Sequence, residues 1–294
     1  MKLTKEHNIL IVGLGLLGGS YAKALSRRGY RVRAITKEPE DLAFALEKGW
    51  IQGGSHRVEP ELVGQAQVVI FALYPHVLIR WIEENQHLFQ PGAILTDVTG
   101  VKQGVVDKVQ QILRPEVEFI GAHPMAGRER SGVQNSDDSI FEGANYVVTP
   151  TDKNTPQAIE LCRHLGQVLG FARISQLSPP EHDRVIAFVS QLTHCIAMGL
   201  MTCQQMEHLE EYTGDSFRDL TRIARMNDQM WSELFLLNRQ ALIEQIQGFE
   251  EELKAIRCLL ETGDREGLRQ KMQASTKRRE LFDKPTPNHQ ENNK

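Results

Sequence analysis

The sequence has few cysteines, and their spacing argues against several kinds of site. Four of the 294 residues are cysteine, and no two of them have CxxC spacing. This spacing gives no support to a zinc site, to thioredoxin-like redox chemistry or to a disulfide framework. We therefore expect no metal site and a reducing, cytoplasmic location. The cysteines are Cys162, Cys195, Cys203 and Cys258.

The sequence also lacks an excess of one charge sign and an export signal. Its 34 Lys and Arg against 38 Asp and Glu give a formal net charge of −4, which argues against a dedicated nucleic-acid-binding protein. The first residues, MKLTKEHN, run into an apolar strand without the apolar core of a signal peptide. The apolar stretch 186–203 contains Ser190, Gln191, Thr193 and His194. We expect it to be a helix buried in a helical domain or at a subunit interface, not a membrane span.

Hydrophobic residues make up 40% of the chain, enough for a sizeable core, and the length predicts about two domains. In the first part, short runs rich in Val and Ile alternate with helical patterns, which predicts a doubly wound α/β domain with a parallel sheet over residues 1–177. The expected strands are Asn8–Gly13, Arg31–Thr36, Gln67–Leu73, Ala93–Val98, Glu118–Ala122, Asn145–Thr149 and Phe171–Ser175. The expected helices are Gly19–Arg28, Asp41–Lys48, Val77–Gln86, Lys102–Leu113 and Pro156–Leu169.

Strand patterns end after Ser178-Pro179-Pro180, and residues 178–283 are expected to form an all-helical domain. Its apolar content is high for a single bundle, which suggests helices shared between two subunits. Met198, Met201 and Met206 have near-helical spacing and are expected in the core. The polar segment 284–294, with two prolines, is expected to be disordered.

The most informative motif of the first domain is a glycine-rich loop, Gly13-Leu14-Gly15-Leu16-Leu17-Gly18. It follows the first strand and opens the first helix, as in a Rossmann dinucleotide-binding domain. Gly13 permits the tight turn, Gly15 the close approach of a pyrophosphate, and Gly18 the packing of helix on strand. We expect the cofactor to be bound here by Gly13, Gly15, Leu16, Leu17 and Gly18.

The end of the second strand bears on the choice of dinucleotide. A carboxylate about 20 residues after the loop would bind the ribose hydroxyl of NAD. The strand instead ends in Thr36-Lys37, and a hydroxyl with a cation suits the 2′-phosphate of NADP. NADP is therefore favoured over NAD, although Glu38 is close enough in sequence to reach the ribose.

Two loops after the fourth and fifth strands carry the polar residues expected at the nicotinamide. The first contains Asp97, a candidate cofactor contact, with Thr99 and Lys102, and the second contains His123. Ligands of doubly wound sheets bind at the carboxyl ends of the strands. A histidine there can accept a proton near neutral pH, although a histidine that only caps a turn would occupy the same position.

Several motifs together resemble the prephenate/arogenate dehydrogenase family of tyrosine biosynthesis. The most specific is GAHPMAGRERSG at residues 121–132, followed by FEGA at 141–144. In the helical half, SQLTH at 190–194 resembles the histidine-bearing helix of the family. The segment FRDLTRIA at 217–224 with Met230-Trp231 resembles its substrate-arginine region. The resemblance covers roughly residues 8–280, in the same order of domains.

The resemblance implies an oxidative decarboxylation of prephenate to 4-hydroxyphenylpyruvate and CO2, or of arogenate to tyrosine, with hydride transfer to NAD(P)+. By the same resemblance, His123 accepts the proton of the 4-hydroxyl, and Arg222 binds a substrate carboxylate. His194 and Ser190 line the substrate pocket, and Trp231 helps to close it. Arg222 could instead form a surface pair with Asp219, and Trp231 could be core packing. A homodimer through the helical domain is also implied.

Two departures from the family concern the catalytic loops. Many members have serine where Gly100 stands, and that serine assists the catalytic histidine. Thr99 is the neighbouring residue that would supply the hydroxyl, unless the role is absent. Arg128 stands where some members have threonine, and it could contact the substrate, pair with Glu129 or bind a cofactor phosphate.

Two other functions remain open on the sequence alone. A dehydrogenase of the β-hydroxyacid group would place a catalytic lysine on a helix of the second domain. A non-catalytic dinucleotide-sensing protein would keep the fold and lose the chemistry.

Overall fold

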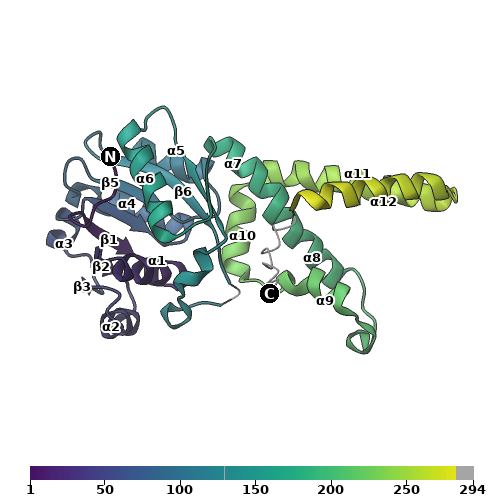
Figure 1. The fold of residues 1–294 in the computed structure, drawn as a ribbon, viewed down its shortest axis with the longest axis horizontal. Helices are drawn as coiled ribbons and strands as arrows, with labels where there is room; N and C mark the ends of the chain where they lie inside the picture. Colours follow the sequence, from purple (N-terminus) through teal and green to yellow (C-terminus); the bar gives the residue numbers. More distant parts are fainter. Residues whose placement is uncertain (129, 283–294) are drawn as a thin grey trace, which may run out of the picture. The chain divides into compact units, whose positions relative to one another are not determined.

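The computed structural model describes residues 1–128 and 130–282 of the chain. It contains an eight-stranded sheet in the order β3-β2-β1-β4-β5-β6-β7-β8 (Figure 1). The first six strands follow the order of the Rossmann fold, in which the strand order reverses between β1 and β4. The strands are β1 (Asn8–Val12), β2 (Arg31–Ile35), β3 (Gly53–Ser55), β4 (Val68–Phe71), β5 (Ile94–Asp97), β6 (Glu118–Met125), β7 (Asn145–Thr149) and β8 (Arg173–Gln176).

The expected parallel sheet is confirmed from β3 to β6, but β7 pairs antiparallel with β6. The register places Gly121 opposite Thr149 and Met125 opposite Asn145. The connection from β6 to β7 contains two short 3-10 turns, η2 (Val133–Asn135) and η3 (Asp138–Phe141), instead of a helix. Parallel neighbours are usually joined through a crossover helix, whereas here the chain turns back beside the strand that it has just left.

Helices cover both faces of the sheet, and the alternation of side chains along each strand explains the two cores. Ile9 and Ile11 point toward α1 (Leu16–Arg27) and α6 (Pro156–Leu169). Leu10 and Val12 point to the other face, which packs on α3 (Pro60–Gly64), α4 (Pro75–Asn85) and α5 (Gln103–Ile112). Successive strand residues face opposite sides, so a strand buried on both faces is apolar throughout. Helix α2 (Pro39–Glu47) packs with the first face.

The sequence patterns placed most of these elements within a few residues, but the short ones were missed. Strand β3 and helix α3 were not expected, because Gly53 and Gly54 carry no strand signal and α3 is only five residues long. The last strand begins at Arg173, two residues later than expected.

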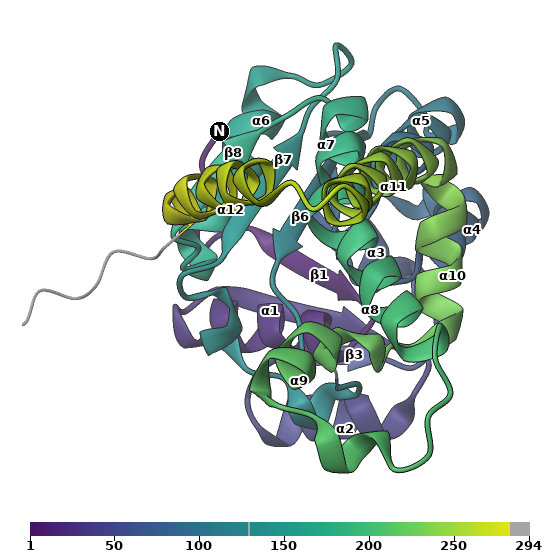
Figure 2. The ribbon, with the colours of Figure 1, turned by 90° about the vertical axis from the view of Figure 1, so that its right-hand side faces the viewer.

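Beyond the sheet, the chain is helical, as expected. The elements are α7 (Pro179–Ile186), the π-helical turn η4 (Ala187–Leu192), α8 (Thr193–Thr202), α9 (Asp215–Thr221), η6 (Arg222–Ala224), α10 (Asp228–Leu237), α11 (Arg239–Glu261) and α12 (Arg265–Arg279), with 3-10 turns η5 (Leu209–Tyr212) and η7 (Glu280–Phe282). A further 3-10 turn, η1 (Gln86–Leu88), follows α4 within the sheet region. Figure 2 shows α7, α8 and α10 in front of the sheet.

The described residues form two compact units, the first Met1–Leu242 and the second beginning at Ile243. Helices α7 to α10 thus pack with the sheet as one body, whereas the sequence divides the chain at residue 177. In the second unit, Asp264 caps α12 by accepting the N–H of Gly267, and Lys271 on α12 pairs with Glu252 on α11 at 2.5 Å. The expectation of a disordered tail falls on residues 284–294, outside the described part of the chain.

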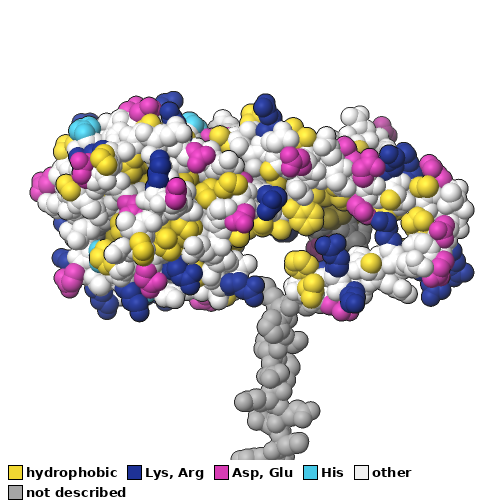
Figure 3. Space-filling model, turned by 90° about the horizontal axis from the view of Figure 1, so that it is seen from above, with side chains coloured by type: hydrophobic (Ala, Val, Ile, Leu, Met, Phe, Trp, Pro, Cys, Tyr) yellow, Lys and Arg dark blue, Asp and Glu magenta, His cyan; other side chains and the backbone are white. Residues whose placement is uncertain are grey.

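The helical stretch Pro179–Thr202 is long and apolar enough to span a membrane by length and composition alone, with a mean hydropathy of 1.6. Only 28% of its apolar window is buried within the chain, so this helix is not the buried core of a helical domain of one chain, and the alternative of a subunit interface stays a prediction. The expected core residues Met198, Met201 and Met206 are likewise 44%, 50% and 61% exposed. On the face drawn in Figure 3, hydrophobic side chains gather near the middle, and acidic and basic side chains are interspersed.

Candidate active site

The glycine-rich loop has the geometry that the sequence predicts for a phosphate site. Gly13 has a φ of +97°, and a Cβ there would meet the carbonyl oxygen of Ala72 at 2.5 Å. A Cβ on Gly18 would meet the carbonyl oxygen of Gly13 at 2.0 Å, so helix and strand pack closely here. A Cβ on Gly15 would meet nothing within 4 Å. The open space beside Gly15 lies at the N-terminus of α1, whose first turn carries no acidic residue, which suits an anion such as a pyrophosphate. Leu16 and Leu17 form this first turn.

At the end of β2, the predicted adenosine contacts differ in exposure. Thr36 is buried, whereas the side chain of Lys37 is 91% exposed. The Lys37 ammonium lies 3.4 Å from the Glu38 carboxylate. The cation that suggested a 2′-phosphate is therefore already next to a carboxylate.

His123 lies within β6, although the sequence placed it in a loop after the strand. The pairing of β6 with β5 ends at Ile120, and β6 then continues with β7 alone, so His123 stands beyond the end of β5. The carboxylate of Asp97 accepts the N–H of Ala122 at 3.1 Å and fixes the backbone beside the histidine. The His123 side chain is half-buried. Burial, followed by the nearby charges of His182 and Lys102, holds the pKa of His123 well below 6.5.

A second histidine, which the sequence did not single out, contacts His123. His123 Nδ1 is 2.9 Å from His182 Nε2, and His182 Nδ1 is 2.7 Å from Asp183 Oδ1. The Asp183 carboxylate also accepts the backbone N–H groups of Lys102 (2.7 Å) and Gln103 (2.8 Å) at the start of α5. His182 and Asp183 are buried. Helix α7 is therefore connected through its own side chains to both β6 and α5.

A buried ion pair lies behind this chain of histidines. Lys102 Nζ is 2.5 Å from Asp97 Oδ2, and both side chains are 0% exposed. The Thr99 hydroxyl contacts the same carboxylate, Lys102 Nζ (3.0 Å) and the carbonyl oxygen of Val101 (2.8 Å). Within the described residues, the Asp97 carboxylate thus contacts Lys102 in the interior, and the Thr99 hydroxyl contacts Asp97 and not His123. The cofactor contact of Asp97 and the catalytic role of Thr99 stay predictions.

Gly100 is the position whose side chain would face the histidine. A Cβ built on Gly100 lies 3.9 Å from His123 Nε2 and 3.5 Å from Leu234 Cδ1 of α10. A serine at this position, as the family resemblance leads us to expect, could contact Nε2, but Gly100 has no side chain.

The predicted substrate residues of the helical part lie on η4, α8, η6 and α10. His194 on α8 stacks on Trp231 of α10, with ring centroids 3.7 Å apart and an interplanar angle of 30°. Ser190 contributes its carbonyl oxygen, which accepts the N–H of His194 Nδ1 at 2.9 Å. Arg222 is exposed in η6, which packs against α8. Trp231 is three residues before Leu234, so one face of α10 connects this stack with the space over Gly100.

Arg128 forms an ion pair with Asp137, in the segment that follows it. Its guanidinium donates to Asp137 Oδ2 at 3.1 Å, and Asp137 also pairs with Lys23 of α1 at 3.1 Å. Hydrogen bonds from Ser139, followed by the ammonium of Lys23, lower the pKa of Asp137. The alternative partner Glu129 lies outside the described residues.

Sequence reasoning missed His182, Asp183 and Lys102 as site residues. The signal for the first two was a His-Asp pair in the first turns of a helix that follows Ser178-Pro179-Pro180. That pair becomes meaningful only when the fold brings it to His123, 59 residues earlier in the chain.

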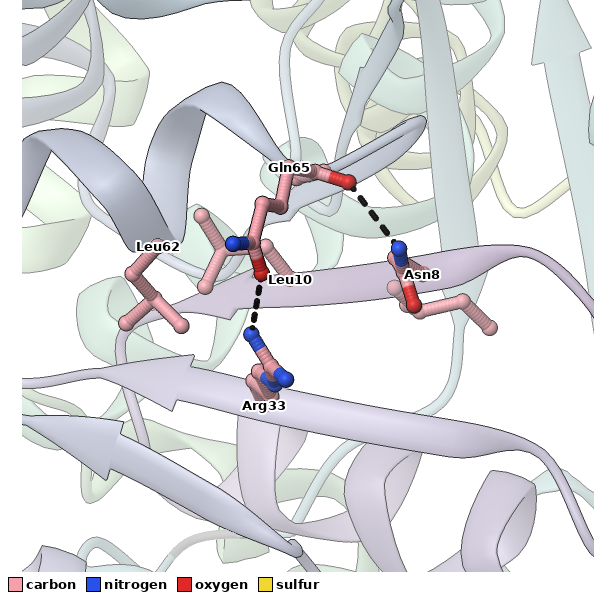
Figure 4. A pocket seen from close by; sticks show the side chains of 7 residues that line it. Asn8, Leu10, Arg33, Leu62 and Gln65 are labelled. Carbon is pink, nitrogen blue, oxygen red and sulfur yellow. Dashed lines mark hydrogen bonds between the residues drawn. The ribbon is translucent and has the colours of Figure 1, made fainter.

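A small pocket lies away from this site, near the start of β1 (Figure 4). It is lined by Asn8, Arg33 and Gln65 among others, and Gln65 contacts the other two side chains. Its volume of about 10 Å³ leaves room for roughly one water molecule, so it is no substrate site.

Comparisons with known proteins agree with this arrangement. Residues 21–173 match the nucleotide-binding domain of prephenate dehydrogenase, and residues 178–274 match its dimerization domain. The prephenate dehydrogenase of Bacillus subtilis (strain 168) is 33% identical over 90% of this chain and 72% of its own length. That of Lactococcus lactis subsp. cremoris (strain MG1363) is 30% identical over 84% of this chain and 70% of its own length.

Solved structures give the same result. The crystal structure of prephenate dehydrogenase from A. aeolicus, in complex with hydroxyphenyl propionate and NAD+, has a TM-score of 0.87 at 29% identity. The match covers 96% of this chain and 100% of that chain. The 3-hydroxyisobutyrate dehydrogenase from Salmonella typhimurium, with 14% identity and a TM-score of 0.54, shares the fold alone. Matches to both domain models and to relatives along most of its length show that the chain belongs to the prephenate dehydrogenase family.

Proposed function

We propose that this protein is a prephenate dehydrogenase, which converts prephenate to 4-hydroxyphenylpyruvate and CO2 as a step of tyrosine biosynthesis. The observation that carries the proposal is the position of His123. Its ring lies past the end of β5, with Nε2 3.9 Å from the position that a Cβ on Gly100 would take and with a pKa well below 6.5. A neutral base at this edge of the sheet suits the oxidation of an alcohol.

In the proposed reaction, His123 accepts the proton of the substrate 4-hydroxyl as C4 becomes a carbonyl-like carbon. The bound dinucleotide supplies the hydride acceptor. Loss of the C1 carboxylate as CO2 leaves the electron pair of the broken carbon–carbon bond in the ring, which becomes aromatic as the 4-oxygen takes the proton back from His123. Arg222 is proposed to hold a carboxylate of the substrate, and the His194–Trp231 stack to bound the pocket. Ser190 would support His194 through its carbonyl group.

The dinucleotide would be held by Gly13, Gly15 and the first turn of α1. We infer that NAD is preferred to NADP, because a 2′-phosphate at Lys37 would meet the carboxylate of Glu38, which lies 3.4 Å from the Lys37 ammonium. The sequence favours NADP, but it does not reveal that these two side chains pair.

We also propose a homodimer and a cytoplasmic location. The match of residues 178–274 to a dimerization domain supports the dimer. So does the apolar helical stretch from α7 to α8, of which Phe188 and Val189 are 57% and 47% exposed.

The test is dinucleotide reduction followed by absorbance, with prephenate and arogenate each combined with NAD+ and NADP+. We expect turnover with prephenate and NAD+, and a loss of about 10²–10⁴-fold in kcat for His123→Asn, the usual contribution of a general base. His164→Asn on α6 is a matched control and should retain activity. Failure of all four combinations with folded protein would refute the proposal, whereas turnover of arogenate alone would change the substrate.

The two other functions have less support. Helices α7 to α10 contain no lysine, so the catalytic residue of the β-hydroxyacid group has no counterpart beside His123. A non-catalytic sensor would need neither a base of lowered pKa nor its buried hydrogen-bonded partners.

A further inference from the structure

The hydrogen bonds behind His123 determine which of its nitrogens carries the proton. They begin at the Asp183 carboxylate, which accepts the N–H groups of Lys102 and Gln103. A carboxylate can only accept, so His182 Nδ1, 2.7 Å away, must carry a proton and donate it.

The next contact follows from the first. Burial lowers the pKa of His182, and a neutral imidazole with its proton on Nδ1 has an acceptor at Nε2. This Nε2 lies 2.9 Å from His123 Nδ1, which must therefore be the donor. The remaining nitrogen of His123, Nε2, is left without a proton, and it faces the space over Gly100.

We propose that His182, oriented by Asp183, is a positioning residue that holds His123 in the tautomer with a bare Nε2 toward the substrate. The tautomer assignment needs no substrate, whereas its catalytic consequence rests on the proposed function. An imidazole whose partner fixes the proton on one nitrogen presents the other as a base.

Two features of the chain give His182 this role. Gly100 has no side chain that could contact His123 Nε2, although a Cβ there would lie only 3.9 Å from it. Among the described residues, His182 is then the partner with which His123 forms a side-chain hydrogen bond. The backbone of Asp183 is also fixed by a hydrogen bond, because the side-chain amide of Asn238 donates to the Asp183 main-chain carbonyl oxygen at 2.8 Å. The same amide donates to Gln191 Oε1 at 2.8 Å.

The decisive measurement uses the wild-type enzyme without substrate. Long-range 1H–15N spectra of protein labelled with [15N]histidine distinguish protonated from bare ring nitrogens, and His123→Asn and His182→Gln assign the two signals among the ten histidines. At about pH 8, above the ordinary histidine pKa, we expect both residues to carry the proton on Nδ1. A proton on His123 Nε2 would overturn the proposal.

Activity gives a second, independent measurement. His182→Leu removes the acceptor, and His182→Gln retains a carbonyl oxygen near the position of Nε2. We expect kcat to fall by about 10–100-fold in the leucine variant with KM within about threefold, and to be partly retained in the glutamine variant. The control His164→Leu replaces a half-buried histidine on α6. Equal kcat values for His182→Leu and the control would overturn the proposal.

A third variant tests the relation with Gly100. In Gly100→Ser/His182→Leu, the new hydroxyl can contact His123 Nε2 and orient the ring again, so the loss of kcat should be smaller than in His182→Leu alone. An equal or larger loss would count against a positioning role. If no variant turned over prephenate or arogenate but the tautomers were as expected, the proposed function would fail and the assignment would stand.

Discussion

Replacing Lys102 by methionine should destabilise the protein by about 3 kcal/mol, because the lysine is fully buried and paired with Asp97. The ammonium and the Asp97 carboxylate are both 0% exposed and 2.5 Å apart. Breaking a buried pair costs about 3–5 kcal/mol, because the remaining charge stays buried without its partner. Asp97 keeps the N–H groups of Thr99 and Ala122 as donors, which favours the lower end of that range.

Urea denaturation at fixed protein concentration measures this effect. With an m-value of about 3 kcal/mol per M, the midpoint should fall by about 1 M. The matched control is Lys108→Met, which replaces an exposed lysine of helix α5, the helix that begins directly after Lys102, and should shift stability by no more than about 0.5 kcal/mol. Equal midpoints for the two variants would refute the reasoning that a buried pair anchors β5 to α5.

Three further predictions concern the cofactor loop, the base and the substrate pocket. Gly15→Ala should leave the denaturation midpoint unchanged and weaken dinucleotide binding, measured by calorimetry, by at least about tenfold. Gly18→Ala should lower the free energy of unfolding by about 1–3 kcal/mol or more, since its Cβ meets backbone at 2.0 Å. Equal denaturation midpoints for the two variants would contradict these separate roles of Gly15 and Gly18. Because burial lowers the pKa of His123, its neutral form persists below pH 6.5. In a pH profile of kcat/KM, activity should therefore be lost on acidification with a midpoint below 6.5, and a midpoint above it would count against His123 as the base. Trp231→Leu removes the ring stacked on His194, which should raise KM about 2–10-fold with little change in kcat. Steady-state kinetics measures both constants, and an unchanged KM would mean that the stack lies outside the substrate pocket.

The sequence was most informative where function depends on consecutive residues. The loop Gly13–Gly18 has the turn, the open position and the close contact expected from its pattern, because each property belongs to one glycine in a fixed local geometry. The continuous apolar run of β1 predicted burial on both faces, because successive residues of a strand face opposite sides of the sheet.

The polar partners of the site could not be predicted in this way. Asp97 and Thr99 were expected to face ligands, but their positions in the sequence do not reveal that Lys102 folds back between them. His182 had no assigned partner, since its contact with His123 depends on how α7 packs against β6. The antiparallel β7 was missed because the direction of a strand is set by its connection and not by its own residues.

The Asp183 carboxylate at the start of α5 has a consequence for the order in which activity appears during folding. The glycine loop is complete within the first 18 residues, but the hydrogen bonds that set the tautomer of His123 come from α7 and, through Asn238, from the segment after α10. A chain whose sheet is formed and whose helix α7 is not yet docked would therefore bind dinucleotide in an unproductive complex. Catalytic competence thus reports on completed tertiary assembly, and cofactor binding does not.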